Sequence, residues 1–351
     1  MTDTPAAATI EGVGLAPLGA WMDSQNLPTG AFESVELLGG GTQNILVRFE
    51  RGGERYVLRR PPVHKRKNSD ETMRREARVL GALAGTDVPH PHLIAACAEE
   101  EVLGGAFYLM EPIDGFNPTV GLPELHASDA SIRRRMGEEF VDASLALGRV
   151  DYEAVGLGDF GRVDGFLERQ VGRWRAQLES YCELDGYPGP EIPGVDDVAR
   201  WLEANRPSTF TPGIIHGDYH FANVMFAHDG PRLAAMVDWE LSTVGDPLID
   251  LGWMMAMWPN DDGSTDTGVT ITPWDGFPLI EEVIERYRAG TTRDLSAINW
   301  YAVLACYKFG IILEGTHARA CAGKADKGYG DLLHAVTLGL FVRGHRYMAA
   351  G

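Results

Sequence analysis

Three oxygen-bearing side chains stand at the ends of short apolar segments in the middle of the chain. Asp218 and Asn223 lie five residues apart in the stretch IIHGDYHFANVMF (214–226), and Asp238 ends the segment LAAMVD fifteen residues after Asn223. Magnesium prefers hard oxygen ligands and often takes only one or two of them from the protein. We therefore predict that Asn223 and Asp238 bind Mg²⁺, while Asp218 orients an incoming hydroxyl group and accepts its proton.

The order and spacing of these side chains predict phosphoryl transfer. An aspartate followed by a metal-binding asparagine and then by a second metal-binding aspartate is typical of enzymes that hold a Mg²⁺–nucleotide complex. A polar turn between two strands is the alternative for Asp218 and Asn223, and the later Asp238 counts against it. Downstream, Asp246 and Asp250 are expected to cap or brace the turn and helix that follow.

Two histidines flank Asp218 in the same stretch. His216 and His220 are four residues apart, and on a helix this spacing would let both imidazoles bind zinc, as in a metal hydrolase. Gly217 and the strand-like flanking segments argue against a helix. We therefore expect His216 to pack and hydrogen-bond as a brace for the loop.

The glycine-rich segment GGGTQN (39–44) lies between two predicted strands. Glycine has no Cβ, so the backbone N–H groups of such a segment can approach a phosphate closely. No Gly-Lys-Ser/Thr follows, as a Walker A loop requires, and a strand follows in place of the helix of a dinucleotide fingerprint. An ordinary hairpin turn is the alternative. The candidate phosphate contacts are Gly39, Gly40, Gly41 and Thr42.

Two adjacent arginines, Arg59 and Arg60, lie near the end of the strand-like segment RYVLRRPP, and Glu76 follows on a predicted helix. A cation beneath a phosphate loop can hold nucleotide phosphates, and a helix carboxylate can hold that cation in place. Neighbouring residues of a strand point to opposite faces, so only one arginine can face inward, and alternation with Val57 favours Arg59. The alternative is a pair of solvated charges on an edge strand.

The first part of the chain that positions these residues is a β-rich segment, residues 1–112. The expected strands are residues 32–38, 45–50, 55–62, 92–100 and 106–113, and the expected helices are residues 11–24 and 69–86, the second with Ser69 as its N-cap.

From Asp114 onward the pattern is helical. Apolar residues recur at three- and four-residue spacing in residues 129–150, 166–183, 195–207, 279–290, 298–315 and 332–350, and strand-like segments interrupt them at residues 213–216, 224–227 and 233–240. We predict an α+β fold of two lobes. Residues 1–112 form the nucleotide-binding N-lobe, and residues 113–351 form a larger helical C-lobe that carries the catalytic loop, the metal site and the acceptor site.

The composition of the chain disfavours several classes of binding partner. The formal net charge of −19 disfavours nucleic acid and anionic membrane surfaces. No apolar stretch approaches the roughly 20 residues that a membrane helix needs, and no secretory signal is evident. The four cysteines form no CxxC pair, which is typical of a reduced, cytoplasmic protein. The sequence leaves the oligomeric state open.

Several motifs together resemble the aminoglycoside phosphotransferase and choline kinase-like superfamily, whose members are relatives of protein kinases. The resemblance covers residues 32 to 256. HGDYHFAN is similar to the catalytic loop of that superfamily, VDWE to its metal-binding segment, GDPLIDLG to the stretch that follows, REARVLGAL to the helix with the pairing glutamate, and FYLMEPIDG to the hinge between lobes.

The resemblance implies a two-lobed protein-kinase-like fold that uses ATP and Mg²⁺. It implies Asp218 as catalytic base, Asn223 and Asp238 as Mg²⁺ ligands, Arg59 on the nucleotide phosphates with Glu76 as its anchor, and peptide groups of Met110, Glu111 and Ile113 on adenine. Protein kinases have a lysine where Arg59 stands, which keeps the charge and changes its reach. No activation segment ending in Ala-Pro-Glu follows, so the expected acceptor is the hydroxyl of a small molecule.

A closer resemblance, in VLRRPP, DYEAVGLGDFG, ERQVGRW and VDWELSTVGDPLIDLGW, is to a branch found alone in bacteria or fused to acyl-CoA dehydrogenases. This resemblance favours a hydroxyacyl-CoA acceptor, and Arg169, Arg173 and Arg175 are candidates for its phosphates. A solvated helix face is the alternative for these arginines, and a polycationic aminoglycoside is the alternative acceptor. A nucleotide-binding pseudokinase that regulates a partner is the alternative from another functional class.

Overall fold

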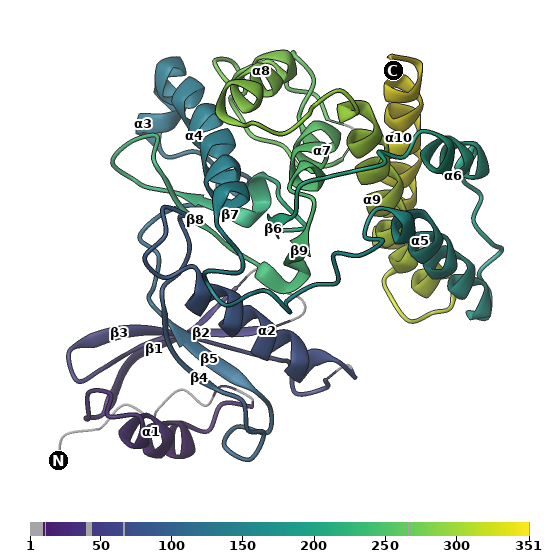
Figure 1. Ribbon diagram of the computed structural model, residues 1–351. Coiled ribbons are helices and arrows are strands. Elements are labelled where there is room, and N and C mark those ends of the chain that lie inside the picture. The colour runs from purple at the N-terminus through teal and green to yellow at the C-terminus, as the bar shows by residue number, and fades with distance from the viewer. Residues whose placement is uncertain (1–9, 11, 40–43, 66, 266, 351) are drawn as a thin grey trace. The chain divides into compact units, whose positions relative to one another are not determined.

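The computed structural model describes residues 10, 12–39, 44–65, 67–265 and 267–350 (Figure 1). The chain divides into two compact units, Met1–Asp114 with Ala235–Glu240, and Gly115–Ala234 with Leu241–Gly351. The segment Ala235–Glu240, which we placed in the C-lobe from the sequence, thus belongs to the same unit as the N-terminal sheet. No helix in the described ranges is long and apolar enough to cross a membrane.

A five-stranded sheet forms the centre of the first unit, with strand order β1-β2-β3-β5-β4 and antiparallel pairing throughout. Its strands are β1 (Phe32–Leu38), β2 (Ile45–Arg51), β3 (Glu54–Arg60), β4 (Leu93–Cys97) and β5 (Phe107–Met110). All five were expected from the sequence. The register pairs Arg59 of β3 with Leu46 on one side and Tyr108 on the other, so the arginine lies in the middle of the sheet.

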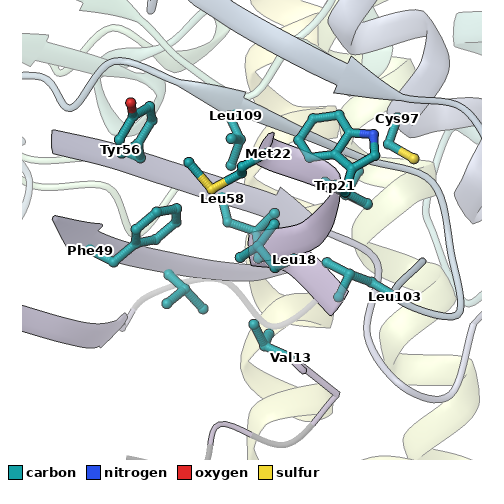
Figure 2. Packing of buried hydrophobic residues seen from close by; sticks show 12 residues of the cluster. Val13, Leu18, Trp21, Met22, Phe49, Tyr56, Leu58, Cys97, Leu103 and Leu109 are labelled. Atoms are coloured by element: carbon teal, nitrogen blue, oxygen red, sulfur yellow. The ribbon is translucent and has the colours of Figure 1, made fainter. Parts of the chain in front are cut away.

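The helices α1 (Leu15–Ser24) and α2 (Ser69–Ala82) cover opposite faces of this sheet (Figure 1). Figure 2 shows apolar side chains of α1, among them Leu18 and Trp21, packed with Leu58 and Leu109 of the strands. On the other face, Glu76 of α2 is buried against β3 and β5. The sheet therefore has one apolar face and one face that carries a buried charge.

The start of α2 differs in detail from the prediction. Ser69 is the first helical residue and Asn68 is the N-cap, without a side-chain capping hydrogen bond. The acidic side chains of Asp70 and Glu71 lie in the first turn, where they interact favourably with the helix dipole.

The second unit is mainly helical. Its helices are α3 (Glu124–Ser128), α4 (Ala130–Arg149), α5 (Glu168–Ser180), α6 (Val195–Ala204), α7 (Leu248–Met257), α8 (Ile280–Gly290), α9 (Ile298–Cys321) and α10 (Lys327–Ala350), with the short 3-10 segments η1 (Tyr181–Glu183) and η2 (Phe221–Asn223). α9 and α10 lie side by side over most of their length (Figure 1). Every residue of α7 is buried, so this helix can serve as a fixed support for neighbouring loops.

Short strands lie on both sides of the loop of residues 216–223, which carries Asp218 and Asn223. β6 (Gly213–Ile215) pairs antiparallel with β9 (Thr243–Gly245), and β7 (Val224–Phe226) follows the loop. The sequence did not predict β9. β8 (Leu233–Met236) ends two residues before Asp238, and η3 (Trp239–Leu241) follows it, so Asp238 lies in a turn and not at a strand end as we expected.

Candidate active site

Gly217 and Asp250 shape the turn after β6. Gly217 has a φ of 85°, and a Cβ there would lie 2.5 Å from the carbonyl oxygen of Leu241, so the position requires glycine. The carboxylate of Asp250, in the first turn of α7, accepts hydrogen bonds from the backbone N–H of His216 at 2.7 Å and of Gly217 at 2.8 Å. Asp250 thus braces the turn before Asp218, whereas the sequence had suggested that it braces the turn and helix after Asp238.

Asp218 follows this turn with its side chain directed at Asn223 and His220. The Asn223 amide donates to Asp218 Oδ2 at 2.9 Å and to its backbone carbonyl at 2.9 Å, and His220 Nε2 lies 3.3 Å from Oδ1. Burial opposes ionisation, but the nearby His220, Lys308 and His216 outweigh it and hold the pKa of the Asp218 carboxyl well below its usual range. Asp218 is therefore a carboxylate at neutral pH.

The two histidines of the loop have different surroundings. His216 is fully buried at the base of the turn, whereas the imidazole of His220 accepts a hydrogen bond from the backbone N–H of Ala222 and approaches Asp218. The sequence did not identify His220 as a partner of Asp218. The sequence feature that could have indicated this contact is the position of His220 two residues after Asp218.

Lys308 of α9 is buried beneath the same turn and was missed in the sequence. Its ammonium group donates to the Gly217 carbonyl at 2.7 Å and lies 4.5 Å from the centroid of the Trp253 ring. Burial lowers the pKa of Lys308 to about 8, against the opposing effect of Asp218 and Asp250. The sequence feature that could have indicated a buried functional lysine is its place as the single charged residue of the apolar segment LACYKFGIIL.

A cavity of about 70 Å³ lies beside Gly217. Its lining combines apolar and aromatic side chains with two cations, and includes Phe166, Gln170, Arg173, Trp174, Trp253 and Lys308. None of the described residues that line it is acidic. The lining is therefore mainly apolar and carries positive charge.

The three arginines predicted to meet substrate phosphates differ in their surroundings. Arg173 lines the cavity, with its guanidinium carbon 5.1 Å from the Trp174 ring centroid. Arg169 is hydrogen-bonded to backbone carbonyls, including that of Arg162 at 2.7 Å, and Arg175 pairs with Glu179 at 3.2 Å. The structure therefore leaves Arg173 as the candidate among the three.

In the first unit, Arg59 joins two carboxylates. Its Nε lies 2.8 Å from Glu76 Oε2, and its Nη2 lies 2.7 Å from Asp238 Oδ1. Glu76 also accepts a hydrogen bond from the Tyr108 hydroxyl at 2.7 Å. Burial opposes the charge of Arg59, but Glu76 outweighs it and raises the arginine's pKa. Arg60 points away and donates to the Pro61 carbonyl, so Arg59 is the arginine that pairs with the helix carboxylate.

Asp238 adopts a left-handed backbone conformation, with a φ of 66°. A non-glycine residue in this region is uncommon and persists where the surroundings impose it. The Met236 N–H, donating to the Pro89 carbonyl at 2.8 Å, fixes the strand before it. Ligand atoms of Glu76, Asp238 and Glu240 lie within 4.8 Å of one another. This all-oxygen donor set fits a hard cation such as Mg²⁺, and Glu240 was missed in the sequence.

The segment after β5 carries the predicted adenine contacts. Met110 lies in the sheet, paired with Leu93 of β4. The Glu111 N–H donates to the His92 carbonyl at 3.0 Å, so this peptide group is already engaged within the protein. Of the predicted residues, Ile113 and the Glu111 carbonyl then remain as candidates for contact with a base.

Of the predicted phosphate loop, Gly39 alone lies within the described residues. It is exposed directly after β1, and a Cβ there would meet no atom within 4 Å. Gly40, Gly41 and Thr42 lie outside the described residues.

Comparison with known sequences places the chain among phosphotransferases. Residues 34–299 match the profile described as "Phosphotransferase enzyme family". Acyl-CoA dehydrogenase family member 11 of Gallus gallus is 29% identical over 308 residues, which are 85% of this chain and 38% of that protein. Probable acyl-CoA dehydrogenase IBR3 of Arabidopsis thaliana is 29% identical over 316 residues, 84% of this chain and 37% of that protein. The chain thus spans less than two fifths of the length of these relatives.

Solved structures give the same fold. A Ralstonia eutropha protein assigned to the aminoglycoside phosphotransferases is 29% identical, with a TM-score of 0.80 over 96% of this chain and 98% of that one. Aminoglycoside 2'-phosphotransferase-IIIa, solved with GDP, is 16% identical with a TM-score of 0.61, over 92% of this chain and 97% of that one. These likenesses confirm the predicted α+β, protein-kinase-like fold.

Proposed function

Since the chain belongs to the phosphotransferase enzyme family, we propose that it transfers the γ-phosphoryl group of ATP to a hydroxyl group of a small molecule. The observation that carries this proposal is the loop around Asp218, where a carboxylate with a lowered pKa is held by the Asn223 amide and His220. This is the arrangement that phosphoryl transfer needs, because catalysis in this reaction is mainly positioning and charge stabilisation.

Asp218 orients the acceptor hydroxyl and receives its proton. A carboxylate with a lowered pKa is a weak base, so it takes the proton only when the acceptor oxygen has begun to bond to phosphorus. When bound, ATP would supply the phosphoryl group, and Mg²⁺ would offset the negative charge on its oxygens. His220 and Lys308 stabilise the ionised form of Asp218 until the acceptor arrives.

The nucleotide is assigned to the first unit. Arg59, fixed by Glu76, would hold phosphate oxygens, while the Glu111 carbonyl and the Ile113 N–H would hold the base. Asn223 and Asp238 would bind Mg²⁺, with Glu240 as an additional carboxylate from the same turn as Asp238.

For the acceptor we propose a hydroxyacyl thioester of coenzyme A in preference to an aminoglycoside. The cavity beside Gly217 carries Arg173, Lys308 and aromatic walls, which suits an apolar acyl chain next to anionic groups. The relatives in Gallus gallus and Arabidopsis thaliana bear acyl-CoA dehydrogenase names, which supports the same class of substrate. The net charge of −19 is the feature that favours a polycationic acceptor.

ADP release from Mg²⁺–ATP, measured against a panel of acceptors, tests the proposal. The panel contains short hydroxyacyl-CoA thioesters, aminoglycosides and choline-like amines. We expect turnover with a hydroxyacyl-CoA that falls by at least about 10³-fold in Asp218→Asn, while the matched change Asp229→Asn, at an exposed aspartate of the same unit, leaves it unchanged.

Two other results would contradict parts of the proposal. Turnover with aminoglycosides alone would assign the acceptor to that class. Tight Mg²⁺–ATP binding without turnover on any acceptor would support the pseudokinase that regulates a partner. The presence of Asp218, Asn223 and Asp238 counts against this second reading.

A further inference from the structure

A second group of titratable side chains lies in the second unit, where α9 and α10 pack together. Glu314 of α9 is fully buried. Its Oε1 accepts a hydrogen bond from the Tyr187 hydroxyl at 2.7 Å, and its Oε2 lies 2.8 Å from His334 Nδ1 of α10. Within the described residues no lysine or arginine pairs with Glu314, so a buried carboxylate here has only an imidazole as a possible cation.

His317 completes the group from the next turn of α9. It follows Glu314 by three residues, a spacing that puts both side chains on one face of the helix. Its ring stacks on that of His334, with centroids 4.5 Å apart and an interplanar angle of 28°. One ligand atom from each of Glu314, His317 and His334 lies within 4.8 Å of the others.

A hydrogen bond between Glu314 and His334 does not account for the buried imidazole of His317 beside them. The His317 Nδ1 atom is buried and makes no hydrogen bond to the described part of the chain, and its distance to Asp331 Oδ1 is 3.6 Å. A buried imidazole nitrogen without a hydrogen bond is unfavourable, and a metal ion shared with the neighbouring imidazole and carboxylate would supply a bond in its place.

We propose that Glu314, His317 and His334 form a binding site for a divalent transition metal ion, namely Zn²⁺. Two imidazoles and one carboxylate are ligands that zinc takes readily, whereas Mg²⁺ and Ca²⁺ prefer oxygen alone. The Tyr187 hydroxyl orients the carboxylate, as outer-shell groups do around metal ligands. Cys321 Sγ lies 3.5 Å from His317 Nε2, on the edge of this group.

Binding would rearrange this group of side chains. Ligand atoms about 2.1 Å from a tetrahedral zinc ion lie about 3.4 Å from one another, whereas Glu314 Oε2 and His334 Nδ1 are 2.8 Å apart here, so these two atoms would separate if both bound the ion. The ion would join α9 to α10 and, through Glu314, to the chain segment that carries Tyr187. The proposal is independent of the phosphotransferase reaction.

Cobalt binding to the whole chain tests this site, because Co²⁺ takes the same ligands and has visible absorption bands. The protein is purified without a polyhistidine tag, stripped with EDTA and titrated with Co²⁺ in the absence of nucleotide, and Zn²⁺ is then added to displace the cobalt. We expect one Co²⁺ per chain and an increase in Tm when Zn²⁺ binds. His317→Gln should abolish the bands. Tyr187→Phe should weaken binding by about 10–100-fold.

Two variants separate this site from other histidines. His64→Gln changes an exposed histidine of the first unit, and His220→Gln changes the one beside Asp218, and both should keep the bands. His334→Gln leaves a side-chain amide that can still donate to Glu314, so loss of the bands in this variant with the unfolding midpoint of the metal-free protein retained would support a ligand role. Absence of bands in the wild type, or bands that persist in His317→Gln and vanish in His220→Gln, would overturn the proposal.

Discussion

Lys308 donates a hydrogen bond from its buried ammonium group to the carbonyl oxygen of Gly217, the residue before Asp218. The lysine lies on α9, 91 residues further along the chain, and it faces the Trp253 ring at 4.5 Å. One side chain thus fixes the backbone of the turn and also places a positive charge near the Asp218 carboxylate. This relationship leads to two predictions that concern Lys308 directly.

Replacing Lys308 with methionine should reduce kcat by about 10–100-fold. The change removes a hydrogen bond from a charged group, worth about 1.5–3 kcal/mol, and also a charge that, after His220, helps to lower the pKa of Asp218. Steady-state kinetics with the acceptor found in the ADP-release panel provide the measurement. Lys327→Met, at an exposed lysine of α10, is the control and should leave kcat unchanged. A loss confined to KM would argue that Lys308 contacts the substrate without positioning the loop.

The pKa of Lys308 also predicts how stability depends on pH. Its pKa is about 8 in the folded protein, below the 10.5 of an unperturbed lysine, so the unfolded chain binds more protons between these two values. Below pH 8 the lysine is charged in both states, and burial of the charge lowers the free energy of unfolding by its full amount. As the pH rises from 8 toward 10.5, the folded protein loses this proton first and the free energy of unfolding increases.

Urea unfolding of the wild type and of Lys308→Met at several pH values measures this effect. The free energy of unfolding of the wild type, taken relative to the variant, should rise by about 2 kcal/mol between pH 8 and 9.5. A difference that stays constant over this range would show that Lys308 titrates normally in the folded protein.

Much of the fold could be predicted from local sequence patterns. All five strands of the first unit and the long helices were expected, because their apolar residues recur at strand or helix spacing and glycine or proline marks many of the boundaries. β9 was missed, because Thr243–Gly245 is too short to show a periodicity and pairs with β6 only in the folded chain. The assignment of Ala235–Glu240 to the first unit likewise follows from long-range contacts.

For the candidate site, the sequence identified the residues that share one short motif. Asp218 and Asn223 lie together in the structure, although the hydrogen bond between them was not predicted, and strand alternation selected Arg59 correctly as the partner of Glu76. Lys308 and Glu240 were missed. Lys308 reaches the loop from a distant helix, and Glu240 joins Asp238 only because the backbone turns sharply there, so no periodic pattern marks either residue.

Arg59→Lys should weaken nucleotide binding by about 10-fold or more. The guanidinium of Arg59 contacts Glu76 and Asp238 through two different nitrogen atoms, and a lysine ammonium cannot reproduce that planar geometry. Calorimetric titration with a non-hydrolysable ATP analogue in the presence of Mg²⁺ measures the affinity. Arg55→Lys, at an exposed position of the same strand, should bind as the wild type does. Equal affinity in Arg59→Lys would show that nucleotide binding does not depend on the planar guanidinium group.

Gly217→Ala should impair both the stability of the protein and its activity. Alanine at a φ of 85° is strained, and its Cβ would lie 2.5 Å from the Leu241 carbonyl, so the turn has to shift and move Asp218 with it. We expect a loss of about 1–3 kcal/mol in the free energy of unfolding, measured with urea, and a decrease in kcat of at least 10²-fold. Gly230→Ala is the matched control, since a Cβ at Gly230 meets no atom within 4 Å. If Gly217→Ala retained wild-type kcat, the position of Asp218 would not depend on this turn, and the brace formed by Asp250 and Lys308 would have no catalytic consequence.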